Sequence, residues 1–129
     1  MRFLLDTHVL LWLLGQPERV PDDVRVQLAD RRHEIFVSAI SALEVATKSR
    51  LGRLDSLGLL EGWAGRTADI GAVELSVRAD HAVHAGSMPW DHADPFDRVL
   101  VSQALIDGLT LVTVDRMMVD LPAPRIVSW

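Results

Sequence analysis

The segment Phe3-Leu4-Leu5-Asp6-Thr7-His8 places an acidic residue directly after a short apolar run. Residues 2–5 are predicted to form a buried strand, and residues 7–14 a helix that Gly15 and Pro17 end. Asp6 therefore falls at the carboxyl end of a strand, where open α/β sheets place their ligands. Its carboxylate is expected either to cap the helix or to belong to a site.

The alternation of strand and helix continues along the chain. Further strands are predicted at residues 35–37, 72–75, 109–114 and 125–127. Helices are predicted from residue 21, at 38–50, 55–67 and 76–84, from residue 94, and as a short turn after Asp115. This order favours a three-layer α/β/α sandwich around a mostly parallel sheet of four to five strands. The 129 residues are expected to form a single domain, 1–129.

Composition narrows the chemistry that the chain can perform. Hydrophobic residues make up 49% and charged residues 24%, a balance typical of a folded globular domain. The chain has no cysteine, so a metal would be held by oxygen or imidazole ligands. Its net charge of −5 counts against a passive nucleic-acid-binding protein. No membrane span or signal peptide is predicted, and a cytoplasmic location is expected.

Four acidic residues stand out because folding alone explains them incompletely: Asp6, Glu44, Asp97 and Asp115. Helix capping is an alternative for Asp6, Asp115 and the nearby Asp94, and Asp97 also suits the first turn of a helix. Glu44 is the exception, because it is predicted in mid-helix on an apolar face. That face is predicted to contain Ile40, Leu43, Glu44, Thr47 and Leu51. A buried carboxylate there needs a cation or a hydrogen-bond network.

Topology is expected to bring these four acids together. Asp6 and Asp115 follow strands, Asp97 begins a helix, and Glu44 lies on a helix that directly follows a strand. In a right-handed parallel sheet covered on both faces, such positions open on one edge. The sequence therefore predicts one acidic pocket, of the kind that binds a hard divalent cation such as Mg²⁺ or Mn²⁺.

At these positions the sequence resembles the PIN-domain ribonucleases, and more closely the VapC-type toxins of bacterial toxin–antitoxin pairs. The matching segments are 4–8, 38–44 with Lys48, 92–98 and 113–115. Each motif is weak alone, but the four occur in the family's order across a chain of the right length. The late-helix acid matches Asp97, because an apolar, small-residue helix follows it, and Asp94 is kept as an auxiliary residue.

The resemblance implies a metal-dependent endoribonuclease whose catalytic metal ligands are Asp6, Glu44, Asp97 and Asp115. It implies Mg²⁺ or Mn²⁺ as the cofactor, RNA such as tRNA or rRNA as the substrate, and products with a 5′-phosphate and a 3′-hydroxyl. It also implies a VapB-like antitoxin that blocks the acidic site, and a homodimer.

Neighbouring residues are expected to assist the site. Thr7 and Thr113 are candidates for auxiliary hydrogen bonds to a carboxylate or to water. His8 and His92 are candidates for substrate contact or proton transfer, although a structural role is the commoner one. The candidate phosphate contacts are Lys48, Arg50, Arg53 and Arg98; Arg98 is alternatively a partner for Asp97.

Three other functions compete with this hypothesis. A non-catalytic PIN-fold module that binds RNA or protein would not need four intact acids. A phosphoacceptor domain would need an acidic pair after the first strand and a lysine after a late strand, which Leu5-Asp6-Thr7 and residues 114–119 lack. A structure-specific DNA nuclease would use the same metal chemistry, and the small size of the chain favours RNA.

Overall fold

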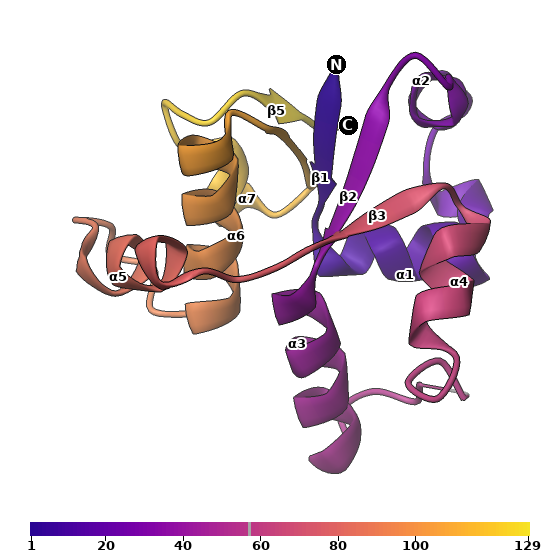
Figure 1. Cartoon of the computed structure of the whole chain (residues 1–129), viewed down its shortest axis with the longest axis horizontal. Coiled ribbons are helices and arrows are strands. Elements are labelled where there is room, and N and C mark those ends of the chain that lie inside the picture. The colour runs from indigo at the N-terminus through magenta and orange to yellow at the C-terminus, as the bar shows by residue number, and fades with distance from the viewer. Residues whose placement is uncertain (57) are drawn as a thin grey trace.

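The computed structural model describes residues 1–56 and 58–129. Its strands are β1 (Arg2–Leu5), β2 (Glu34–Ser38), β3 (Ala72–Leu75), β4 (Thr110–Val112) and β5 (Ile126–Val127). Within the described residues they form one five-stranded sheet in the order β3-β2-β1-β4-β5. Figure 1 shows β3, β2 and β1 beside one another. Every neighbouring pair is parallel, which confirms the predicted parallel sheet.

Alternation of side chains along the central strands produces two apolar cores. On β1, Phe3 and Leu5 belong to one core and Leu4 to the other, and all three are fully buried. The first core is closed by α1 (Thr7–Gly15), α2 (Asp22–Ala29) and α4 (Trp63–Asp69), and the short 3₁₀ helix η1 (Pro17–Arg19) lies between α1 and α2 in the chain. The second is closed by α6 (Pro95–Asp107) and α7 (Arg116–Val119), and α5 (Ala79–Ser87) packs on α6. The predicted three-layer sandwich is confirmed.

The helix predicted over residues 55–67 is wrong in its bounds. The described part of residues 55–62 forms turns and irregular backbone, residue 57 lies outside the described residues, and helix begins at Trp63. Gly58 has a φ of +79°, which is incompatible with a continuing helix, and Gly62 occupies the position before α4. The apolar spacing was correct for a helix, but the glycines delay its start.

The helix predicted over residues 76–84 is displaced toward the carboxyl end of the chain. α5 begins at Ala79 and not after a Ser76 cap, because the backbone N–H of Arg78 donates to Nδ1 of the buried His81. The carbonyl of Ser76 instead accepts a hydrogen bond from Gln103 on α6. Contacts with α6 therefore decide where α5 starts.

β4 is shorter than the predicted 109–114, and its end defines a crevice. The chain leaves β1 for β2 on one side of the sheet, whereas β4 lies on the other side of β1. The carboxyl ends of β1 and β4 therefore form a topological switch point, where α/β folds bind ligands. Asp6 directly follows β1, and Thr113 directly follows β4.

The helix α3 (Ala39–Arg50) follows β2 and extends away from the sheet (Figure 1). Ser38 caps it, since Oγ accepts a hydrogen bond from the N–H of Ile40. The predicted apolar face is wrong in part: Leu43 is 54% exposed and Leu51 is 49% exposed. Most of α3 projects beyond the strands, so fewer positions can be buried. The buried residues of α3 are Ser41, Glu44 and Val45.

Within the described ranges, none of the helices has the length and apolar character needed to cross a membrane.

Replacement of Leu4 by alanine is expected to lower the free energy of unfolding by about 3 kcal/mol, because it leaves a cavity in the second core beside the central strand β1. Leu43→Ala is the matched control on exposed helix surface, and a change within about 0.5 kcal/mol is expected. Urea unfolding followed by circular dichroism measures both. Equal losses for the two variants would contradict the assigned burial.

Candidate metal centre

Asp6 is buried, with 3% of its surface exposed, at the start of α1. Its side chain makes no capping hydrogen bond, so the capping alternative does not account for it. Its Oδ2 instead accepts a hydrogen bond of 2.7 Å from Oγ1 of Thr113, which is also buried. Burial raises the pKa of Asp6, against the opposing effect of the Thr113 hydrogen bond.

Glu44 is buried on α3, with 3% of its surface exposed. Its Oε2 forms an ion pair with Lys48 one helical turn later. Its Oε1 is buried and has no hydrogen-bond partner among the described residues. A buried carboxylate oxygen without a donor is costly, so the geometry leaves this atom available for a cation. The expected need of Glu44 for a cationic partner is met in part by Lys48.

Asp94 and Asp97 lie at the start of α6. Oδ1 of Asp94 accepts from the backbone N–H groups of Phe96, at 2.9 Å, and of Asp97, at 3.4 Å, as predicted for a cap. Asp97 is buried, with 6% of its surface exposed, and its Oδ2 lies 2.6 Å from Nε2 of His92. Burial raises the pKa of Asp97 to about 7, against the His92 hydrogen bond and with the help of nearby negative charges.

Asp115 precedes α7 and caps it, because Oδ1 accepts a hydrogen bond of 2.9 Å from the N–H of Met117. Its own backbone N–H donates to Oγ1 of Thr113. The hydroxyl of Thr113 therefore bridges the carboxylate of Asp6, which follows β1, and the backbone of Asp115, which follows β4. Its predicted auxiliary position, close to the acids, agrees with the structure.

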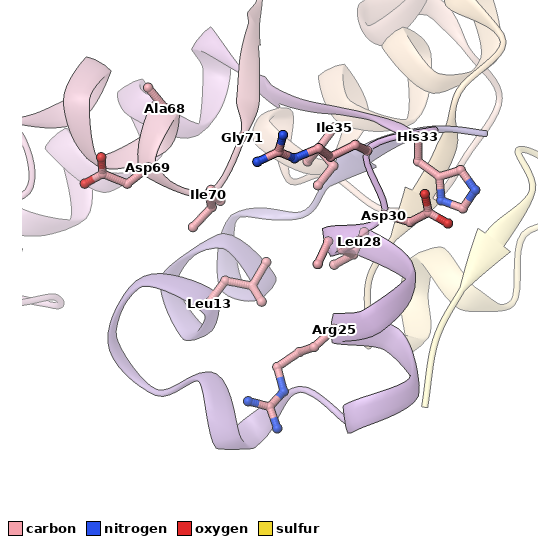
Figure 2. A pocket seen from close by; sticks show the side chains of 12 residues that line it. Leu13, Arg25, Leu28, Asp30, His33, Ile35, Ala68, Asp69, Ile70 and Gly71 are labelled. Carbon is pink, nitrogen blue, oxygen red and sulfur yellow. The ribbon is translucent and has the colours of Figure 1, made fainter.

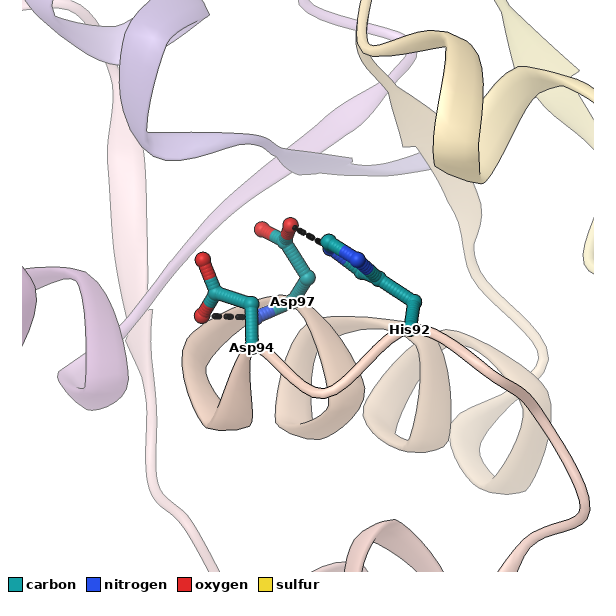
Figure 3. A group of neighbouring side chains, drawn as sticks. All are labelled: His92, Asp94 and Asp97. Atoms are coloured by element: carbon teal, nitrogen blue, oxygen red, sulfur yellow. Dashed lines mark hydrogen bonds and ion pairs between the residues drawn. The ribbon is translucent and has the colours of Figure 1, made fainter.

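The four acids interact electrostatically, although they come from four segments. The charge of Glu44 acts on Asp6, and the charges of Asp6, Asp94 and Asp115 act on Asp97. The structure thus brings the predicted carboxylates into one region. Within the described part of the chain, the ligand atoms of His92, Asp94 and Asp97 lie within 4.8 Å of one another (Figure 3).

Lys48 and Arg53 line a cavity of about 220 Å³ next to Glu44. The predicted auxiliary Thr7 and the candidate His8 also line it. Oγ1 of Thr7 lies 2.9 Å from Oγ of Ser41, so this threonine joins α1 to α3 and does not contact an acid through that bond. Arg50 is exposed on the last turn of α3 and does not line this cavity.

The expected role of Arg98 is corrected by its contacts. Its guanidinium does not pair with Asp97. It donates hydrogen bonds to backbone carbonyls of the segment before α6. The acceptors are Ala85, Met88, Trp90 and His92, at 2.6, 2.6, 2.7 and 3.0 Å. An arginine that satisfies four carbonyls stabilises a loop, so Arg98 is a structural residue here.

A larger cavity lies elsewhere. It has a volume of about 620 Å³ and lies where β2 and β3 begin (Figure 2). Its lining includes Leu13, Leu28 and Ile70, and none of the four predicted acids. Cavity size therefore does not mark the acidic site; the convergence of carboxylates does.

Comparison with known proteins assigns the fold family. The model of the PIN domain family matches residues 3–124. The chain belongs to the PIN-domain family. This PIN domain is 30% identical to Ribonuclease VapC22 of Mycobacterium tuberculosis, over 97% of this chain and 95% of that protein.

Solved structures support the PIN fold at low sequence identity. VapBC2 of Rickettsia felis, bound to a DNA fragment from its promoter, aligns with a TM-score of 0.63 and 17% identity, over 100% of this chain and 99% of that chain. VapBC-1 of nontypeable Haemophilus influenzae aligns with a TM-score of 0.60 and 16% identity, over 100% and 98%. FitAB bound to the IR36 DNA fragment aligns with a TM-score of 0.52 and 19% identity, over 98% and 94%.

The donor set of this PIN domain fits a divalent metal. Most of the atoms that could bind a metal here are buried carboxylate oxygens. Oε1 of Glu44 has no hydrogen-bond partner among the described residues. The negative charges of neighbouring carboxylates contribute to the raised pKa of Asp6 and of Asp97. Hard oxygen ligands of this kind suit Mg²⁺ or Mn²⁺.

The raised pKa of Asp97 predicts how the stability of the metal-free protein depends on pH. The folded state holds this proton up to about pH 7, whereas the unfolded chain releases it near the ordinary value of 3.8. The free energy of unfolding should therefore fall as pH rises from about 4 to about 7, by an amount on the order of a few kcal/mol. Urea titrations in EDTA test this, and Asp97→Asn should flatten the slope. An unchanged slope in that variant would refute the assignment.

Thr113→Val is expected to destabilise the fold by about 1–3 kcal/mol, because the buried carboxylate of Asp6 loses its donor without a change of shape. Thr110→Val, at the opposite end of β4, is the matched control. Urea unfolding of the two variants provides the measurement. A larger effect of Thr110→Val would contradict the bridging role of Thr113.

Proposed function

We propose that this VapC-type PIN domain is a metal-dependent endoribonuclease toxin that hydrolyses RNA phosphodiester bonds. The observation that carries the proposal is the convergence of four carboxylates from separate segments at the switch point between β1 and β4. The similarity to Ribonuclease VapC22 of M. tuberculosis supports RNA as the substrate.

Asp6, Glu44, Asp97 and Asp115 are proposed to hold Mg²⁺ or Mn²⁺. When bound, such an ion supplies positive charge beside the scissile phosphate and lowers the pKa of a water molecule. The resulting hydrolysis is expected to leave a 5′-phosphate and a 3′-hydroxyl. Asp94 has an auxiliary role, since its cap positions the backbone N–H of Asp97 and fixes the first turn of α6.

The side chains around the acids position them for this chemistry. Thr113 fixes Asp6 through its hydroxyl and also accepts a hydrogen bond from the backbone of Asp115. Lys48 offsets the charge of Glu44 and interacts electrostatically with Asp94 and Asp97. Because these bonds form within the protein itself, the carboxylates are oriented before any substrate binds.

RNA is proposed to approach from the side of Lys48 and Arg53, which line the cavity beside Glu44. The exposed Arg50 extends this basic side along the end of α3. Cations at this position attract a phosphate backbone locally, although the net charge of the chain is −5. Structured or single-stranded RNA, such as tRNA or rRNA, is the proposed substrate.

The proposed partner is a VapB-like antitoxin that covers the acidic site. The support comes from the structural neighbours, which are VapBC and FitAB assemblies. We also propose a homodimer, on the basis of the same family resemblance. Because the antitoxin is expected to cover the acidic site, toxin activity should be measured on protein that is free of antitoxin.

The test of the proposed function is cleavage of labelled total RNA by purified protein with Mg²⁺ or Mn²⁺. Asp6→Asn removes one carboxylate charge while it keeps the shape of the side chain, and it is expected to lower the cleavage rate at least about a hundredfold. EDTA should abolish cleavage, and Val26→Ala, a change at an exposed position on α2, should leave it intact.

Matched RNA and DNA strands separate the proposal from its nearest alternative. Preferential cleavage of DNA would favour a structure-specific DNA nuclease. Absence of metal-dependent cleavage by well-folded, antitoxin-free protein would favour a binding module. The stable fold of each variant is verified by circular dichroism before it is assayed.

A further inference from the structure

His92 lies between α5 and α6, two residues before the Asp94 cap. Its ring is directed toward the start of α6, with Nε2 2.6 Å from Oδ2 of Asp97 (Figure 3). The side chain is 20% exposed, so solvent reaches a ring whose nitrogen faces the acidic site. His92 differs in this from a core histidine such as His81, which is fully buried.

The loop that carries His92 is fixed by the protein. Arg98 donates to the carbonyls of Met88, Trp90 and His92 itself. The indole ring of Trp90 packs against the imidazole with a centroid separation of 4.9 Å. Because the backbone and one side of the ring are both held, the orientation of His92 is set in advance, which is the condition for an effective metal ligand.

The geometry of the donors matches a shared ion. One ligand atom each from His92, Asp94 and Asp97 lies within 4.8 Å of the other two. Two ligands at about 2.1 Å from one ion are separated by at most about 4.2 Å, so the 4.8 Å within which these three atoms lie is close to the width of one coordination sphere.

A second observation indicates that the neighbouring part of the acidic site also needs positive charge. Oε1 of Glu44 is buried without a partner among the described residues. The Lys48 ammonium that pairs with Glu44 also interacts electrostatically with Asp94 and Asp97, so the orphaned oxygen and the His92 group belong to one region. The protein itself supplies one ammonium for several carboxylates there, which leaves negative charge for a bound cation to balance.

We infer that Nε2 of His92 is a direct metal ligand beside Asp97, in addition to the four acids proposed above, and that this mixed nitrogen–oxygen set makes the site prefer Mn²⁺ to Mg²⁺. The inference rests on the proposed function, because it concerns the same acidic site. Imidazole is a good ligand for first-row transition metals, whereas Mg²⁺ selects oxygen. In an alternative role, His92 would only orient Asp97 through a hydrogen bond.

Pulsed electron paramagnetic resonance of Mn²⁺-loaded protein separates these two roles. A bound imidazole nitrogen produces ¹⁴N modulation of the electron spin echo, and this modulation is expected in the unmodified protein. It should be lost in His92→Gln, whose amide can still donate a hydrogen bond to Asp97. His33→Gln is the matched control, because His33 lines the distant cavity near the start of β2. Modulation that persists in His92→Gln would overturn the inference.

Calorimetric titration provides an independent measurement. His92→Gln is expected to raise the dissociation constant for Mn²⁺ at least about tenfold while it changes that for Mg²⁺ less than about threefold. Equal effects on both ions would overturn the inference and assign His92 the orienting role. Neither measurement needs RNA. If Mn²⁺ coordination by His92 is observed but RNA is not cleaved, the proposed ribonuclease function is refuted and the inference about His92 stands.

Discussion

The burial of several carboxylates in one small region is the constraint on which the rest of the site depends. Asp6, Glu44 and Asp97 are each less than a tenth exposed, and burial is the main reason that the pKa of Asp6 and of Asp97 is raised. A fold that only needed stability would place such groups at the surface, where water solvates them. The cluster is therefore best explained by a cation that balances its charge.

The surrounding polar residues make this charged cluster compatible with a stable fold. Thr113 supplies a hydroxyl to Asp6, Lys48 supplies an ammonium to Glu44, and His92 contacts Asp97. Arg98 acts indirectly, because it donates a hydrogen bond to the backbone carbonyl of His92 and so stabilises the loop that carries this residue. Each of the three acids thus has one neighbour that satisfies it in part, while Oε1 of Glu44 has no hydrogen-bond partner in the described part of the chain. That pattern supports a metal-dependent hydrolase better than a module with merely structural acids.

Several features could be predicted from local sequence because their causes are local. Apolar runs specified β1 and β2, Pro95 after Asp94 specified the start of α6, and Ser38 specified that of α3. The order of the strands and helices was then sufficient to predict convergence of the four acids. The prediction of a helix over residues 55–67 was wrong in its bounds, and this reason is also local. Gly58 adopts a positive φ, which the spacing of apolar residues does not reveal.

The sequence by itself determined the order of the strands and helices, the acids that follow them and the family to which they belong. Only the tertiary structure decided which neighbours those acids have. Arg98 was adjacent to Asp97 in sequence and yet contacts backbone carbonyls, whereas Thr113, 107 residues from Asp6, supplies its hydrogen bond. The physical reason is that hydrogen bonds and charge interactions depend on distance and orientation in space, which parallel pairing of β1 and β4 fixes and sequence separation does not.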